Sequence, residues 1–118
     1  MKAKLVIIFS LLLSFVCMTA YADDYNARQA KRYTQEAEYY QKKADGYRRE
    51  SQYNLKQAEG YQREAAYYTR KGDADRAKDY SRKAERAMDN YKTQMRYAKN
   101  ADETAADYLR KAANALRK

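Results

Sequence analysis

A fourteen-residue repeat constrains this chain more than any other feature of its sequence. Residues 37–50 read AEYYQKKADGYRRE, residues 51–64 read SQYNLKQAEGYQRE, and residues 23–36 fit the same pattern more loosely. Residues 77–90 and 105–118 resemble each other and stand exactly two repeat lengths apart. Each repeat unit is two heptads, so the pattern predicts α-helices that pack along one face.

The heptads, lettered a to g, have small and larger residues at alternating spacings of three and four. In the first half the small a residues are Ala30, Ala37, Ala44, Ser51, Ala58 and Ala65, and the d residues are Tyr33, Tyr40, Tyr47, Asn54, Tyr61 and Tyr68. The second half continues with Ala77, Tyr80, Ala84, Ala87, Tyr91, Gln94, Ala98, Ala101, Ala105, Tyr108, Ala112 and Ala115. This spacing is typical of the seam of a coiled coil, and no segment alternates with period two as a strand would.

The two halves lose phase by two positions at Lys71-Gly72-Asp73. Coiled coils commonly absorb insertions of three or four residues, so a shift of two indicates a chain reversal. Glycine commonly ends a helix and aspartate commonly caps the next one. We predict an all-α fold, an antiparallel helical hairpin with helices over about residues 24–71 and 74–117. A three-helix bundle with a second break near residues 100–102 and a single uninterrupted helix are the alternatives.

Residues 1–22 have the three-part pattern of a secretory signal peptide. Lys2 and Lys4 precede an apolar run over residues 5–18, and Ala20-Tyr21-Ala22 supplies small residues for cleavage. The run is shorter than the roughly 20 residues of a membrane span. We predict cleavage after Ala22, a helical domain over residues 23–118, and a periplasmic or secreted location. An uncleaved anchor and a lipid attached at Cys17 are the alternatives.

The composition after the predicted leader excludes most catalytic chemistry. The chain has no His, and its one Cys, Cys17, lies in the leader. Residues 23–118 therefore lack the commonest general base and any thiolate nucleophile or metal ligand. The three glycines are isolated, so no glycine-rich loop could hold a phosphate. We expect no enzymatic activity, no cofactor and no metal.

A candidate interaction edge follows from the large aliphatic residues, which share the e position beside the seam. They are Leu55 in the first half and Met88, Met95, Leu109 and Leu116 in the second. Methionine adapts to varied partners, so this edge predicts a homo-oligomer or a helical protein partner. A widened core within one bundle is the alternative.

Two further sets of residues stand out. A candidate aromatic stripe occupies the c position, off the seam, at Tyr25, Tyr39, Tyr53 and Tyr67. Exposed tyrosines suit interfaces, although repeat duplication alone also explains them. A polar seam layer is expected where both halves of the hairpin turn polar at the same height, at Ser51, Asn54, Tyr91 and Gln94.

The formal net charge is +9, and removal of Lys2 and Lys4 leaves +7. A basic chain favours anionic partners. The export signal argues against nucleic acid and for an anionic envelope surface, although the basic residues form no compact cluster in the sequence. We expect a non-enzymatic structural or protein-interaction protein that acts through coiled-coil packing. A small periplasmic chaperone-like stress protein and a binder of anionic envelope polymers are the alternatives.

Overall fold

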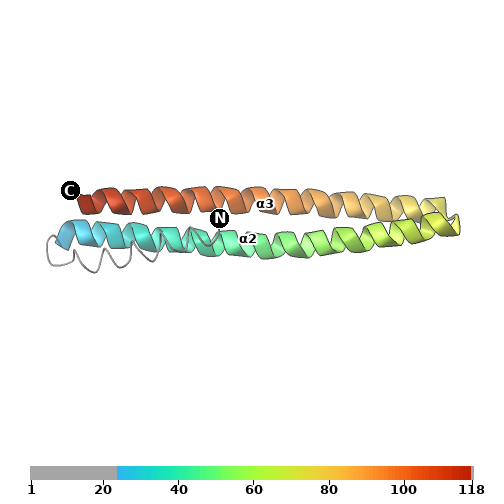
Figure 1. The fold of residues 1–118 in the computed structure, drawn as a ribbon, viewed down its shortest axis with the longest axis horizontal. Coiled ribbons are helices and arrows are strands. Elements are labelled where there is room, and N and C mark those ends of the chain that lie inside the picture. Colours follow the sequence, from blue (N-terminus) through green and yellow to red (C-terminus); the bar gives the residue numbers. More distant parts are fainter. Residues whose placement is uncertain (1–23, 118) are drawn as a thin grey trace. The chain divides into compact units, whose positions relative to one another are not determined.

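The computed structural model describes residues 24–117, which form two helices joined by a tight turn (Figure 1). Helix α2 is Asp24–Lys71 and helix α3 is Ala74–Arg117. The predicted all-α, antiparallel two-helix arrangement is confirmed. Helix α3 continues through residues 100–102, so the three-helix alternative is wrong, and the reversal at Gly72 removes the single-helix alternative.

The predicted signal peptide, residues 1–22, lies outside the described residues. Neither α2 nor α3 contains a stretch that is apolar enough over a sufficient length to span a bilayer.

The turn is built from a helix C-cap followed at once by a helix N-cap. Gly72 has a φ of 79°, which is the left-handed conformation that glycine adopts without strain. The Gly72 N–H donates to the Thr69 carbonyl (3.1 Å) and the Asp73 N–H to the Tyr68 carbonyl (2.9 Å), the pair of bonds that defines a Schellman motif. Asp73 Oδ1 then accepts a bond from the Arg76 N–H (3.2 Å) and caps α3. The predicted reversal at Gly72 and Asp73 is confirmed.

Replacing Gly72 with alanine is expected to destabilise the fold by roughly 1–2 kcal/mol, because a side chain at positive φ meets its own backbone. Urea unfolding followed by circular dichroism measures the loss. Gly46→Ala is the matched control, because Gly46 lies inside α2. There alanine is expected to raise the free energy of unfolding by about 0.5–1 kcal/mol. Equal effects of the two substitutions would contradict the role of Gly72 in the turn.

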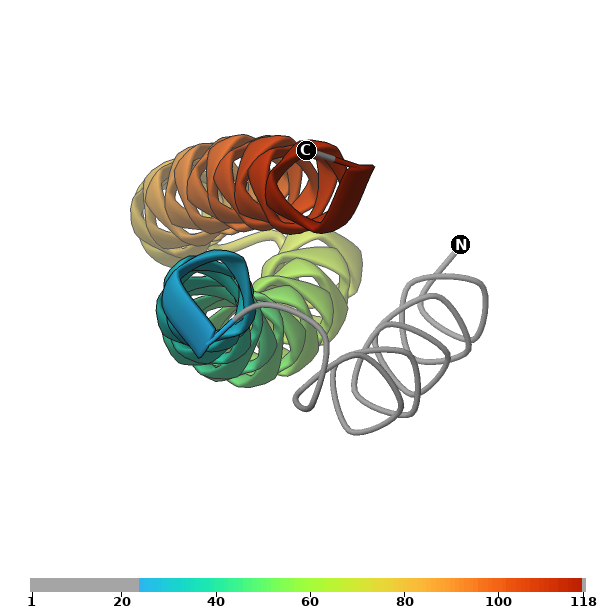
Figure 2. The same cartoon turned by 90° about the vertical axis from the view of Figure 1, so that its left-hand side faces the viewer.

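The described residues belong to two units. Unit 1 pairs residues 24–44 of α2 with residues 99–117 of α3. Unit 2 is residues 45–98, which contain the turn, the end of α2 and the start of α3. Within each unit the two helical segments lie side by side and run in opposite directions (Figures 1 and 2).

The core of each unit is made mainly of alanine. In unit 1, Ala30 and Ala112 form one buried cluster, and Ala37 and Ala105 form another with Leu109. In unit 2 the buried side chains are Ser51, Ala58, Ala65, Ala84, Ala87 and Ala98. Among the described residues, the largest side chains that are fully buried are only Thr34 and Ser51. Each layer therefore removes little apolar surface from water, and its contribution to stability is correspondingly small.

Half-buried tyrosines flank the alanines and contact one another between the helices. In unit 1 the Tyr108 ring lies 5.8 Å from that of Tyr40 and 6.2 Å from that of Tyr33. Unit 2 repeats this triad, with Tyr80 lying 5.5 Å from Tyr68 and 6.2 Å from Tyr61. Aromatic pairs at such distances add about 0.5–1.5 kcal/mol beyond their buried area.

A lysine from α3 lies over the central ring of each triad. The ammonium of Lys111 is 4.8 Å from the Tyr108 centroid, and that of Lys83 is 4.9 Å from the Tyr80 centroid. The attraction between each of these ammonium groups and the ring beneath it is of the cation–π kind.

Candidate functional site

The candidate interaction edge divides between the two units. In unit 1, Leu109 is only 3% exposed and belongs to the cluster of Ala37 and Ala105. Leu116 is half-buried and packs against the Ala30 and Ala112 cluster. These two leucines therefore widen the core of unit 1.

In unit 2 the same edge is more open. Leu55 and Met88 are half-buried, and the Met95 side chain is 38% exposed. Met88 also lines an open groove of about 380 Å³ beside the seam. The other residues that line the groove are Gln62, Ala65, Ser81, Ala84, Glu85, Asp89 and Lys92. Unit 2 thus presents an apolar strip bordered by charged residues.

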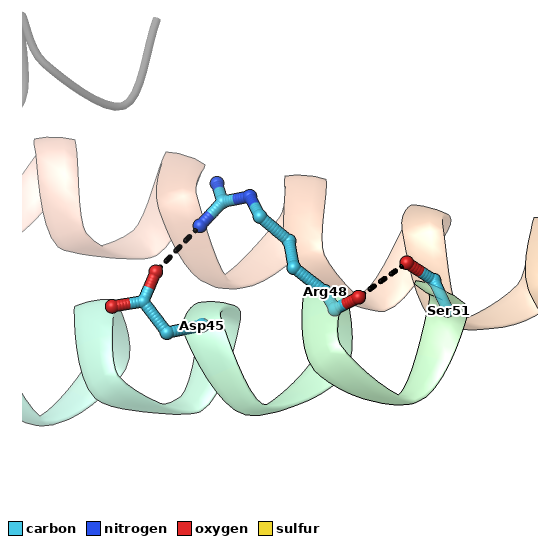
Figure 3. A network of polar contacts seen from close by, with 3 residues as sticks. All are labelled: Asp45, Arg48 and Ser51. Atoms are coloured by element: carbon cyan, nitrogen blue, oxygen red, sulfur yellow. Dashed lines mark hydrogen bonds and ion pairs between the residues drawn. The ribbon is translucent and has the colours of Figure 1, made fainter. Parts of the chain in front are cut away.

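The residues of the polar seam layer are buried or half-buried, but the hydrogen bond that Ser51 makes stays within α2. Ser51 is fully buried, and its hydroxyl donates to the Arg48 carbonyl at 2.6 Å (Figure 3). The Arg48 guanidinium also pairs with Asp45 at 3.0 Å. On α3, the Oε1 atom of Gln94 is buried and accepts no hydrogen bond from the described residues. Asn54 and Tyr91 are half-buried.

The four tyrosines of the candidate aromatic stripe are all exposed, by 64%, 52%, 58% and 44% in chain order. Tyr25 and Tyr39 lie in unit 1. The Gln29 amide donates to the Tyr25 hydroxyl at 3.2 Å, and the Lys43 ammonium lies 5.0 Å from the Tyr39 ring.

Unit 2 repeats both contacts. The Gln57 amide donates to the Tyr53 hydroxyl at 2.8 Å, and the Lys71 ammonium lies 5.4 Å from the Tyr67 ring. In each pair the partner lies four residues after the tyrosine, which is one helical turn later.

A longer repeat in α2, twice the length of the fourteen-residue unit, underlies this duplication. Residues 25–45 read YNARQAKRYTQEAEYYQKKAD, and residues 53–73 read YNLKQAEGYQREAAYYTRKGD. The Tyr-Asn and Tyr-Tyr pairs, a Gln and a Lys recur at matching places. Adjacent fourteen-residue units do not show this longer repeat. It is visible in the sequence only when segments two units apart are aligned.

The two helices differ in the charges that they carry at the outermost heptad position. In α2 the outermost heptad position, f, carries Arg28, Gln35, Lys42, Arg49, Lys56, Arg63 and Arg70, all of them exposed. In α3 the same position carries Asp75, Arg82, Asp89, Arg96, Glu103, Arg110 and Arg117, so acids alternate with bases along most of the helix. The f positions of α2 contain no acid, so exposed basic residues recur along this helix at intervals of one or two heptads.

Within residues 24–117, no three acidic side chains lie close enough together to hold a metal ion. Comparison with protein-family models, curated proteins and solved structures finds no match to this chain.

Proposed function

We propose that the protein is an exported, non-enzymatic structural or interaction protein whose heptad seam packs as a coiled coil. In this proposal residues 1–22 are a cleaved signal peptide, and the helical part works in the periplasm or outside the cell. The partner is a second copy of this chain or another amphipathic helix.

The methionine strip of unit 2, Met88 and Met95, carries this proposal. Met88 lines the groove and Met95 is 38% exposed, while the alanine layers beside them bury little surface. A helix laid along the strip would cover both methionines, and the unbranched side chain of methionine adapts to different partner shapes. The charges of Glu85, Asp89 and Lys92 at the border of the groove would orient such a helix.

The test combines sedimentation with capture from cell-envelope extracts, washed at low and at high salt. Met88→Lys with Met95→Lys is expected to abolish association, because it places two charges in the contact. Gln52→Lys with Ala66→Lys is the matched control, since both positions are exposed on α2 outside the strip. Association that resists high salt and disappears only in the methionine variant supports helix packing.

Two results would overturn the proposal. A complex that dissociates at high salt and is unaffected by the methionine substitutions would indicate that the protein binds its partner electrostatically. Suppressed aggregation of a test protein without a stable complex would point to a chaperone-like function.

A further inference from the structure

The outward face of α2 in unit 2 combines exposed rings with unpaired positive charge. Its c positions are Gly46, Tyr53, Gly60 and Tyr67, and its f positions are Arg49, Lys56, Arg63 and Arg70. We call these eight residues the basic-aromatic face. Each c residue is next to an f residue on the helix surface, so each ring lies beside cationic groups.

The four cations of this face have no ion pair within residues 24–117. Asp45 and Glu59 lie to one side of the row and Glu50 and Glu64 to the other, and no acid occupies the c or f positions here. The corresponding f positions of α3 in this unit alternate in sign, as Asp75, Arg82, Asp89 and Arg96. Charge complementarity therefore favours an anionic partner on the α2 side of unit 2.

Gly60 lies between the two exposed tyrosines, and packing within the chain does not require a glycine there. A Cβ atom at Gly60 would approach only the tip of Arg63, at an ordinary 4.0 Å, and Gly46 has the same relation to Arg49. Each glycine nevertheless weakens the helix by about 1 kcal/mol relative to alanine. A gap between two rings lets a ligand approach the helix backbone closely.

The spacing of the charges favours one class of anionic polymer over another. At about 1.5 Å per residue the cations recur about every 10.5 Å and the rings about every 21 Å. An extended glycan repeats its disaccharide over a length close to the cation spacing. One strand of DNA carries a phosphate about every 3.4 Å along its axis, which is far denser than this row.

We propose that the basic-aromatic face binds a linear acidic glycan that carries one carboxylate per disaccharide. Each carboxylate pairs with a cation of the f row. Tyr53 and Tyr67 stack on sugar rings, and Gly60 admits the sugars between them. This face is separate from the methionine strip, so the inference stands whether or not the chain self-associates.

The experiment measures binding of the purified protein to hyaluronan, an acidic glycan with this charge spacing, by titration calorimetry at low salt. Lys56→Ala with Arg63→Ala is expected to weaken binding several-fold, and Arg82→Ala with Arg96→Ala to change it little. Both pairs remove two f-position charges from unit 2, so net charge alone affects them equally. Tyr53→Ala is expected to weaken binding roughly tenfold, a loss comparable to that of one aromatic ring that stacks on a nucleic-acid base.

Gly60→Ala separates binding from folding, because it is expected to raise the melting temperature while weakening binding. Unchanged binding in this variant would overturn the role of the gap. Equal losses of affinity from the two pairs of charge substitutions, or no binding by the unaltered protein, would contradict glycan binding at the basic-aromatic face. Tighter binding of single-stranded DNA of matched length would overturn the glycan assignment and show that the polymer is a nucleic acid.

Discussion

Replacing Ala58 with leucine is expected to destabilise the protein by about 1–3 kcal/mol, a typical cost of forcing a larger side chain into a packed layer. Ala58 has no exposed surface. Ser51 and Ala65, one heptad to either side, are also buried, and α3 contributes Ala84 and Ala87 at 4% exposure each. The buried positions around Ala58 are occupied only by small residues, so the added carbons would push the helices apart. Urea unfolding followed by circular dichroism gives the free energy.

Ala66→Leu is the matched control for Ala58→Leu. Ala66 lies on the same helix but is exposed, so its substitution is expected to change stability by no more than about 0.5 kcal/mol. If Ala58→Leu proved stabilising, the alanine layers would have to contain space for larger side chains. The close approach of the two segments of unit 2 would then need another explanation.

Replacing Gln94 with leucine is expected to stabilise the protein by about 1–3 kcal/mol, the usual cost of a buried polar group without a partner. The Gln94 Oε1 atom is buried and accepts no hydrogen bond from the described residues. Leucine removes this group and places an apolar side chain in the seam. Thermal unfolding at several protein concentrations measures the gain.

Gln52→Leu is the comparison for Gln94→Leu, because Gln52 is an exposed glutamine and gains nothing from the change. Combining Gln94→Leu with Asn54→Leu is expected to raise stability further and to produce more than one associated species, since a polar layer helps to fix register. A loss of stability in Gln94→Leu would mean that its amide has a partner in solution.

Several residues that the heptad spacing assigns to the inner face of the helices are buried or half-buried. The a residues Ala37, Ala44 and Ala58 have no exposed surface, and the d residues Tyr33 and Tyr61 are half-buried. The turn was predictable because glycine and aspartate stand where the phase breaks. These features depend on local periodicity and on the backbone preferences of single residues, both of which can be read directly from a sequence.

Depth of burial beside the seam could not be predicted in the same way. Leu109 and Met95 share the e position, yet Leu109 is 3% exposed and Met95 is 38% exposed. Leu109 fills space next to Ala37 and Ala105, where small residues leave room for it. A heptad letter gives the direction of a side chain, whereas its burial depends on the volumes of its neighbours. The tyrosine triads were missed for a similar reason, since their rings meet diagonally between layers.

The sequence separations within the two triads bear on the order in which the chain folds. Tyr80 and its partners Tyr68 and Tyr61 lie close to the turn on either side of it, whereas Tyr108 contacts rings from the opposite end of the described chain. Bringing distant segments together costs more chain entropy than closing a short loop. The capped turn at Gly72 already holds the near triad close, so we expect unit 2 to form first and unit 1 to follow it.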